Sequence, residues 1–219
     1  MPVSVKFCVM GKNKPNLIRP TEKVVKHYYY KKYQKDERYY LADKILDNLV
    51  EKFPANNELG NIYIKVVAIN AFYSAGVLAT FKMAQHILKL NIDDKLQSGN
   101  TKIVNKIAKL PNVRNFYAFA TKYCSFHNYE QFPIFDSFIS KMLINYQKQD
   151  TFNLIDFSDN NLKNYSEFKE ILNNFKNHYR LKNLSFRQID KFLWLYGKEY
   201  QNKLINSKSN KKGRNKIKK

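Results

Sequence analysis

Lys122 and Asp136 are the residues whose types and positions could support catalysis. Lys122 lies in a predicted helix among three aromatic side chains, which are Phe119, Tyr123 and Phe126. Burial among such rings disfavours the ammonium form, so it lowers the pKa of a lysine and favours a nucleophilic amine. The competing interpretation is a surface lysine or a phosphate ligand, which is the usual role of lysine in a basic protein.

Asp136 stands at the predicted start of the next helix. An aspartate at that position commonly caps the helix by accepting a hydrogen bond from a backbone N–H, which is worth about 1 kcal/mol. A carboxylate can also stabilise positive charge that develops on a reacting carbon. The two roles are compatible, and the sequence leaves both open.

Cysteines and histidines near these residues add little to the predicted chemistry. Cys124 fits a small buried hydrophobic residue better than a nucleophile. His127 could polarise a leaving group, although a solvated or capping histidine is more usual in a loop. The two cysteines and four histidines of the chain show no metal-ligand spacing, so we predict neither a metal site nor a cofactor.

Helical periodicity along the chain predicts the elements that must position these residues. Ser185 and Gln188 have the spacing of a capping box, and Thr21 is a predicted N-cap. We expect an all-α fold with a single helical domain over residues 1–202, either compact or in two lobes around a cleft. A short β-like run at residues 3–10 predicts an extended arm or a loop. The expected helices lie within residues 21–53, 61–90, 101–107, 114–126, 136–146, 166–179 and 185–200.

The segment 61–90 is the most apolar part of the chain and predicts a core helix, with a break around residues 74–76. Its uncharged run, residues 66–81, is too short for a membrane span. Asn70 and Ser74 lie four residues apart on this helix. Buried polar groups need partners, so these two either bond within the core or line a cleft.

The net charge of +21 is extreme, with 39 basic and 18 acidic residues. Eight basic residues and no acid lie in residues 203–219, which leaves +13 for residues 1–202. Such a field attracts polyanions, of which nucleic acid is the commonest, and an anionic membrane surface is the rival. Residues 203–219 carry no core-forming pattern and predict a disordered basic tail.

The N-terminal residues are too weakly apolar for a signal peptide. Two cysteines give no disulfide framework, in keeping with a reducing compartment. We therefore expect a cytoplasmic protein associated with the nucleoid, without membrane contact. We also expect it to be a monomer.

Two short motifs in the middle of the chain resemble those of the helix-hairpin-helix DNA glycosylases. Residues 110–113 read Leu-Pro-Asn-Val before a helix, and residues 132–136 read Phe-Pro-Ile-Phe-Asp before another. The oxoguanine DNA glycosylase branch is the most similar, and the likeness covers roughly the middle third to half of the chain. In that family a hairpin grips DNA phosphates through backbone amides, and the second motif delivers a catalytic aspartate at a helix start. The resemblance therefore implies a helix-hairpin-helix DNA glycosylase-like domain with Asp136 as the essential carboxylate.

The resemblance also implies residues that bind the substrate. It places the predicted phosphate contacts in the hairpin, and a lysine of the last helix offers one further contact. It places a base pocket on the segment 61–90 and the end of the hairpin helix, with Trp194 available for stacking. The predicted nucleic-acid contacts are Lys109, Asn112, Arg114, Asn115 and Lys191, and the predicted pocket residues are Asn70, Tyr73, Ser74, Phe126 and His127.

The chain departs from the family pattern at the hairpin. Asn112 and Arg114 replace two glycines. Asparagine tolerates positive φ, so the turn can survive, and Arg114 can bind a phosphate with its own side chain. Phe116 and Tyr117 occupy the region where the family carries its lysine nucleophile, and Lys122 is the nearest lysine.

The functional expectation is a DNA glycosylase, with possible AP-lyase activity through a Schiff base at Lys122. It would act on duplex DNA with the target base flipped into the pocket. One alternative is a non-catalytic nucleic-acid-binding module that keeps the scaffold for backbone contact. Another is a basic helical protein that binds RNA or ribosome surfaces.

Overall fold

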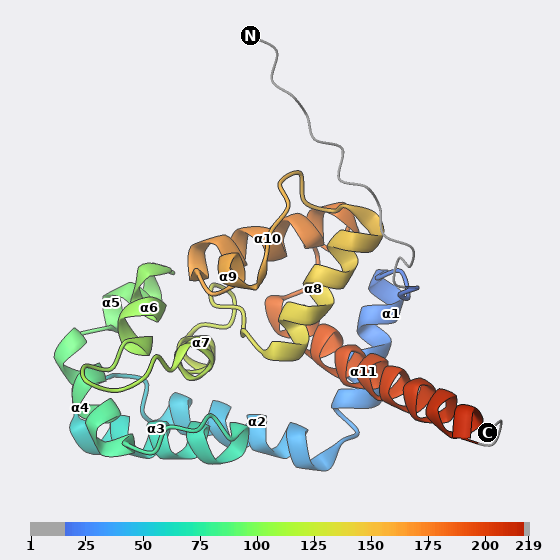
Figure 1. Ribbon diagram of the computed structural model, residues 1–219. Helices are drawn as coiled ribbons and strands as arrows, with labels where there is room; N and C mark the ends of the chain where they lie inside the picture. Colours follow the sequence, from blue (N-terminus) through green and yellow to red (C-terminus); the bar gives the residue numbers. More distant parts are fainter. Residues whose placement is uncertain (1–15, 217–219) are drawn as a thin grey trace, which may run out of the picture.

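The computed structural model describes residues 16–216, and these residues form helices without a β-strand (Figure 1). The all-α class predicted from periodicity is confirmed, and the extended arm predicted at residues 3–10 lies outside the described residues. The elements are α1 (Glu22–His27), η1 (Tyr28–Tyr33), α2 (Glu37–Lys52), α3 (Leu59–Tyr73), α4 (Thr80–Leu90), α5 (Asp93–Gln97), α6 (Lys102–Ala108), α7 (Tyr117–His127), α8 (Ser137–Asp150), α9 (Asp159–Leu162), α10 (Tyr165–His178) and α11 (Phe186–Lys216).

Local capping signals form as the sequence predicts. The Val24 N–H donates to Thr21 Oγ1 over 3.3 Å at the start of α1. At the start of α11, the Gln188 N–H donates to Ser185 Oγ over 3.3 Å, and the Ser185 N–H donates to Gln188 Oε1 over 3.0 Å. Both pairs satisfy backbone donors that a helix end leaves without a partner.

The apolar segment 61–90 forms two helices, with the predicted break in between. Ser74 (φ 47°) and Gly76 (φ 70°) adopt left-handed conformations, and the Val77 N–H donates to Asn70 Oδ1 over 2.8 Å. The positive φ favours glycine at position 76, and a Cβ there would lie 2.6 Å from the Arg114 guanidinium, so that side chain would have to move. The turn brings α4 back against α3 (Figure 1).

The expectation that α3 is a core helix surrounded by other helices holds for one face. Ile62, Val66 and Ile69 are fully buried. On the other face, Ile64 is 49% exposed and Val67 is 40% exposed. The reason is that α3 lies at the edge of the fold, against α2, α4 and α7, with no helix on its outer side (Figure 1).

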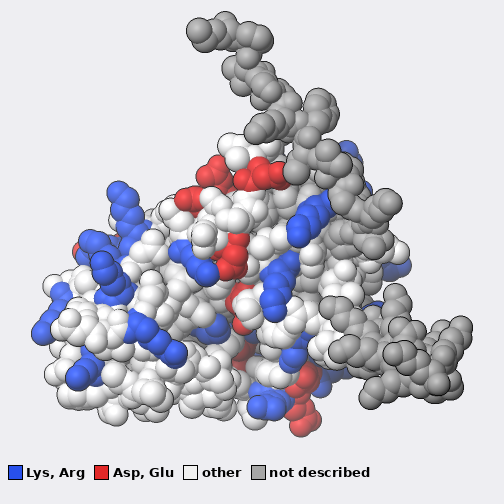
Figure 2. Space-filling model, in the orientation of Figure 1, with Lys and Arg blue, Asp and Glu red and all other residues white. Residues whose placement is uncertain are grey.

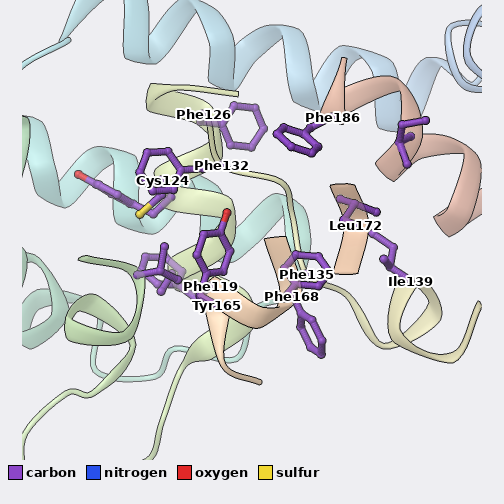
Figure 3. Packing of buried hydrophobic residues seen from close by; sticks show 14 of the residues in the cluster. Phe119, Cys124, Phe126, Phe132, Phe135, Ile139, Tyr165, Phe168, Leu172 and Phe186 are labelled. Carbon is purple, nitrogen blue, oxygen red and sulfur yellow. The ribbon is translucent and has the colours of Figure 1, made fainter. Parts of the chain in front are cut away.

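Helix α7 forms the centre of the hydrophobic core. Its residues from Phe119 to Phe126 are all buried. Rings from α10 and from the segment before α8 pack beside it, with Phe132 stacked on Tyr165 at 6.1 Å between ring centroids (Figure 3). Lys122 is therefore carried into the interior by a helix that is buried on every side.

A second buried lysine holds the turn between α2 and α3. The Lys65 ammonium donates to the carbonyl oxygens of Phe53 (2.9 Å) and Ala55 (3.0 Å) and to Asn56 Oδ1 (2.9 Å). Asn56 Oδ1 also accepts from the Tyr123 hydroxyl of α7 over 2.6 Å. Burial lowers the pKa of Lys65 to about 8. This cluster attaches the α2–α3 turn to the core helix.

Helix α11 is longer than the sequence predicts. It continues to Lys216, so residues 203–216 are helical, and the prediction of a disordered tail from residue 203 is wrong for them. A nucleated helix extends one hydrogen bond at a time at low cost, and this stretch contains no proline to stop it. Within residues 16–216, no helix is both long enough and apolar enough to cross a membrane.

The close packing of α8 and α11 gives a test of the fold. A Cβ at Gly197 would lie 3.0 Å from Met142 Cγ and 3.3 Å from the backbone oxygen of Phe138. We expect Gly197→Ala to lower the free energy of unfolding by about 1–3 kcal/mol, because the two helices must separate. Urea unfolding followed by circular dichroism measures this change.

Gly60→Ala is the matched control. Gly60 lies in the first turn of α3, where a Cβ meets nothing closer than Glu58 Oε1 at 3.9 Å. Alanine there should raise stability by about 0.4–1 kcal/mol through the lower entropy of the unfolded chain. Equal effects of the two substitutions would contradict the packing of α8 against α11.

Candidate functional site

One cavity, with a volume of about 200 Å³, contains both Lys122 and Asp136 in its wall. It forms where α2, the end of α3, α7, the start of α8 and the first turns of α11 converge. Its lining combines charged and aromatic side chains. The lining residues are Arg38, Tyr39, Ala42, Asp43, Phe72, Tyr73, Ser74, Lys122, Ile134, Asp136, Ile139, Arg187, Asp190, Lys191 and Trp194.

The segment 132–136 positions Asp136 and crosses the interior without regular secondary structure. We call it the interior strap. Three side chains, each from a different helix, form hydrogen bonds with its backbone. The Tyr165 hydroxyl donates to the Pro133 oxygen over 2.8 Å. The Ile134 N–H donates to Asp190 Oδ2 over 2.9 Å, and the Phe135 N–H donates to Thr121 Oγ1 over 3.1 Å. These bonds connect the strap to α7, α10 and α11.

Asp136 caps α8, as the sequence predicts. Its Oδ1 accepts from the Phe138 N–H over 2.8 Å, and its backbone is extended, with φ −144° and ψ 155°. The carboxylate is half-buried and lines the cavity. Capping therefore does not remove Asp136 from the site, and both predicted roles are compatible with its position.

Lys122 is almost fully buried, with 5% of its surface exposed. Its ammonium donates to the Ala118 oxygen over 3.3 Å and lies 5.4 Å from the centre of the Tyr73 ring. Desolvation lowers the pKa of Lys122, the Asp136 carboxylate opposes this change, and the Lys191 ammonium adds to it. No ion pair of Lys122 occurs among the described residues, so the burial of its ammonium is only weakly compensated.

The other cavity lysine, Lys191, is engaged in a buried charge network. Its ammonium lies 2.5 Å from Asp43 Oδ2. The hydroxyls of Tyr33 (2.5 Å) and Tyr73 (2.6 Å) also donate to Asp43. Burial raises the pKa of the Asp43 carboxyl, but Lys191 and the hydrogen bonds outweigh it, so the net pKa is lowered and Asp43 is ionised. The prediction that Lys191 contacts phosphate on the surface is corrected here, because its charge is buried and neutralised.

Asp190 is the second buried carboxyl in the cavity wall. Its side chain is 3% exposed, and Oδ1 has no hydrogen-bond partner among the described residues. Desolvation raises the pKa of Asp190 to about 7, against the opposing effects of the Ile134 N–H and of nearby cations. Asp190 therefore changes its charge near neutral pH.

Aromatic side chains provide the apolar wall. Tyr39 of α2 and Trp194 of α11 pack edge to face, with 4.7 Å between ring centroids. The Lys198 ammonium lies 4.4 Å from the centre of the Trp194 ring and donates to the Tyr39 hydroxyl over 3.0 Å. Phe72, which is 44% exposed, completes this wall at the end of α3.

The predicted base-pocket residues divide into two groups. Tyr73 and Ser74 line the cavity. Asn70, Phe126 and His127 do not line it. Asn70 accepts a hydrogen bond within the α3–α4 turn. Phe126 packs against the Tyr73 ring, and His127 packs on Tyr123 with 5.1 Å between ring centroids. Their predicted place in the pocket is corrected, because the turn and the core rings take these side chains away from the cavity.

The predicted hairpin forms between α6 and α7. Asn112 has φ 58°, so asparagine adopts the left-handed conformation that the turn requires. Lys109 and Asn115 form an isolated antiparallel bridge that closes the hairpin, and their side chains are exposed with that of Asn112. Arg114 donates to the Gly76 oxygen over 2.6 Å, which ties the hairpin to the α3–α4 turn.

Sequence reasoning missed the part of the site that comes from α2. Arg38, Tyr39 and Asp43 line the cavity, although they lie in a predicted amphipathic helix without an unusual motif. Asp43 falls on the buried side of that helix. A carboxylate among apolar core positions was the available signal. In the described part of the chain, no three His, Cys, Asp or Glu side chains gather as a metal site would require.

Comparison with known proteins gives two matches. The sequence model of a protein family described as an N-terminal domain (HI_0787_N) matches residues 24–131, which include Lys122 but end before Asp136. An uncharacterized protein of Haemophilus influenzae is 37% identical over 134 residues, or 59% of this chain. The chain spans 63% of the length of that relative. No solved structure matches the chain. Neither description names an activity.

The buried Lys191–Asp43 pair gives a test of the charge network. Lys191→Met leaves the Asp43 carboxylate buried without its closest cation, so we expect a loss of roughly 3–5 kcal/mol in the free energy of unfolding. Lys32→Met is the control. Lys32 pairs with Glu199 at the surface, where both side chains are more than a third exposed, and the loss there should be at most about 1 kcal/mol. Comparable losses measured by urea unfolding would contradict the assignment.

The raised pKa of Asp190 predicts a dependence of stability on pH. Its folded-state pKa of about 7 exceeds the unfolded value of about 4, so the folded state holds the proton more tightly. The stabilisation is complete below about pH 4 and is lost as the pH rises through about 7. Asp190→Asn removes this effect. The free energy of unfolding of the variant, relative to that of the wild type, should therefore rise by roughly 3 kcal/mol from pH 5 to pH 8. Urea unfolding at both pH values measures the gain, and a constant difference would contradict the pKa.

Proposed function

We propose that this protein binds DNA and cleaves the N-glycosidic bond of a base held in the cavity, with AP-lyase chemistry at Lys122. The observation that carries the proposal is the presence of a desolvated lysine and a helix-capping aspartate in the wall of one cavity. The two residues come from different helices. Their meeting is therefore a property of the fold and not of neighbouring positions in the sequence.

Asp136 supplies the charge that bond cleavage needs. Breaking an N-glycosidic bond gives the sugar oxocarbenium character, and a carboxylate beside C1′ stabilises it. The Asp136 carboxylate is held in place by its hydrogen bond to the Phe138 N–H. A fixed carboxylate needs little reorganisation as positive charge develops, so its stabilisation is available throughout the reaction.

Lys122 supplies the nucleophile. Desolvation lowers the pKa of its ammonium, which favours the neutral amine that attacks C1′. The amine then forms a Schiff base with the sugar, and this intermediate leads to strand cleavage. The aromatic wall of Tyr39, Phe72 and Trp194 offers a surface on which a flipped base could stack.

The charge of the protein supports DNA as the partner. The net charge is +21, and Figure 2 shows lysine and arginine side chains spread over one face, with acidic side chains in a narrow band between them. Positive charge over a wide surface favours contact with the phosphate backbone. In the hairpin, Lys109, Asn112 and Asn115 are exposed and available for such contact.

A non-catalytic nucleic-acid-binding module is the second candidate. One observation favours it: Phe116, in the region where the glycosylase family carries its lysine, is buried and apolar. Under this alternative, Lys122 and Asp136 serve the fold, and the hairpin and basic surface bind nucleic acid. Such a module could also bind RNA in preference to DNA.

The test uses duplex DNA that carries either an abasic site or an oxidised guanine, with borohydride to trap a Schiff base. We expect a covalent adduct with the wild type and none with Lys122→Ala. Asp136→Asn keeps a good N-cap but removes the charge, so it should slow base excision by about 10²–10³-fold with little loss of stability. Denaturing gels measure the adduct and the excision.

Lys163→Ala is the control for loss of a positive charge, because Lys163 is the C-cap of α9 and its side chain is 56% exposed. It should trap DNA as the wild type does. An absence of both adduct and excision in the wild type, with DNA affinity retained in Asp136→Asn, would exclude the enzyme in favour of the binding module. Tighter binding to structured RNA than to duplex DNA at matched salt would identify RNA as the ligand.

A further inference from the structure

The Lys122 ammonium must lose a proton before its nitrogen can attack a sugar, and it lies where water has little access. A nucleophilic lysine in such a position needs an acceptor inside the site. The cavity wall contains three carboxyl groups, those of Asp43, Asp136 and Asp190. The hydrogen bonds that each carboxyl group already makes determine which of them is available to accept the Lys122 proton.

Two of the three carboxyl groups are already engaged. Asp43 binds the Lys191 ammonium at 2.5 Å and accepts from the hydroxyls of Tyr33 and Tyr73. Asp136 Oδ1 caps α8 through the Phe138 N–H. The Asp136 charge is also needed at the sugar in the proposed reaction, and protonation would remove it.

Asp190 is in a different state. Its Oδ2 accepts from the Ile134 N–H over 2.9 Å, which fixes the carboxyl against the interior strap. Its Oδ1 is buried and has no partner among the described residues. A buried polar atom without a partner is uncommon and needs an explanation, and a catalytic role is one of those known. The charge of Asp190 also acts on the Lys122 ammonium, so the two groups are electrostatically coupled.

We infer that Asp190 is the proton acceptor for Lys122 and passes the proton on to the sugar oxygen that leaves C1′. This inference rests on the proposed lyase function. Asp190 lines the same cavity as Lys122 and exchanges protons with the nucleophile and the leaving oxygen, so its proposed role is that of a catalytic general base and acid. The ligand class is the open-chain aldehyde form of an abasic deoxyribose.

The proton and electron balance of the step is complete. The Lys122 ammonium gives a proton to Asp190 Oδ1, and the freed lone pair forms the bond to C1′ while the C1′–O π bond breaks and its electrons pass to the oxygen. The carbonyl oxygen takes that proton, the nitrogen loses a second proton by the same route, and the oxygen leaves as water. Lysine ammonium and aldehyde thus become an iminium ion and water, and no oxidant or reductant takes part.

The surroundings of Asp190 fit a group that gains and loses a proton. Arg187 and Lys191 of α11, Lys176 of α10 and the Ile134 N–H all favour its charged form, while burial disfavours it. Arg187 is held by Asp47 at 2.8 and 3.0 Å, and Lys191 is held by Asp43. The Lys122 ammonium of α7 also interacts electrostatically with the Asp190 carboxyl. The Tyr165 hydroxyl of α10 does so as well, and it donates a hydrogen bond to the Pro133 oxygen of the strap.

The experiment measures borohydride trapping on duplex DNA with a preformed abasic site, from pH 6 to pH 9, for the full-length protein and Asp190→Asn. Asparagine can still accept from the Ile134 N–H but cannot take a proton. We expect the variant to trap about 10²-fold more slowly at pH 7 and to lose the rise in rate near pH 7. Its affinity for the same DNA should be unchanged.

The sign of the change separates a proton acceptor from a purely electrostatic residue. The Asp190 charge raises the pKa of Lys122, so its removal leaves more neutral amine. An electrostatic role alone therefore predicts faster trapping in Asp190→Asn, whereas a proton acceptor predicts slower trapping. A variant that traps as fast as the wild type, or faster, with the same pH profile would overturn the inference.

Thr121→Val is the control for disturbance of the interior strap. Thr121 Oγ1 accepts from the Phe135 N–H over 3.1 Å, so its loss weakens the strap without removing a carboxyl group. This variant should keep the rise in rate near pH 7. If it loses that rise as Asp190→Asn does, Asp190 acts only by holding the strap. A wild-type protein that gives no adduct at all would reject the proposed function together with the inference.

Discussion

The interior strap is the constraint on which the site depends. Peptide groups that cross a protein interior outside regular secondary structure must find partners, and each one left without costs about 1–3 kcal/mol. Tyr165, Asp190 and Thr121 supply those partners from three helices. The same three bonds therefore assemble α7, α10 and α11 and fix the point at which Asp136 enters the cavity.

Charge pairing then distinguishes the cationic groups of the cavity from one another. The interior has a low dielectric constant, so unpaired charges there are costly and paired ones are strongly held. Asp43 neutralises Lys191, and Asp47 neutralises Arg187. Lys122 is left with one long hydrogen bond to the Ala118 oxygen. A ligand can therefore engage Lys122 without breaking an ion pair among the described residues.

The sequence predicted features that depend on a few neighbouring residues. The Asp136 cap, the capping box of Ser185 and Gln188, and the left-handed Asn112 all follow from local backbone preferences. The joint presence of Lys122 and Asp136 in one cavity was expected from a resemblance. This shared cavity depends on contacts between segments that are distant in the sequence.

Long-range packing explains what the sequence could not provide. The position of Asp43 beneath the cavity depends on how α2 packs against α11, which no spacing encodes. Lys191 was predicted to contact phosphate, whereas it pairs with Asp43, which lies on a helix distant in the sequence. The length of α11 was underestimated because helix continuation needs no apolar pattern.

The hydrogen bonds of the Lys65 ammonium determine how the α2–α3 turn responds to the salt concentration. Two carbonyl oxygens and an amide oxygen converge on the ammonium in the way that oxygen ligands surround a bound alkali or alkaline-earth cation. The chain carries this cation on its own side chain, so it cannot diffuse away or be exchanged. The geometry of the turn should therefore be independent of the salt in which the protein is placed, even though the binding of a polyanion to its surface would not be.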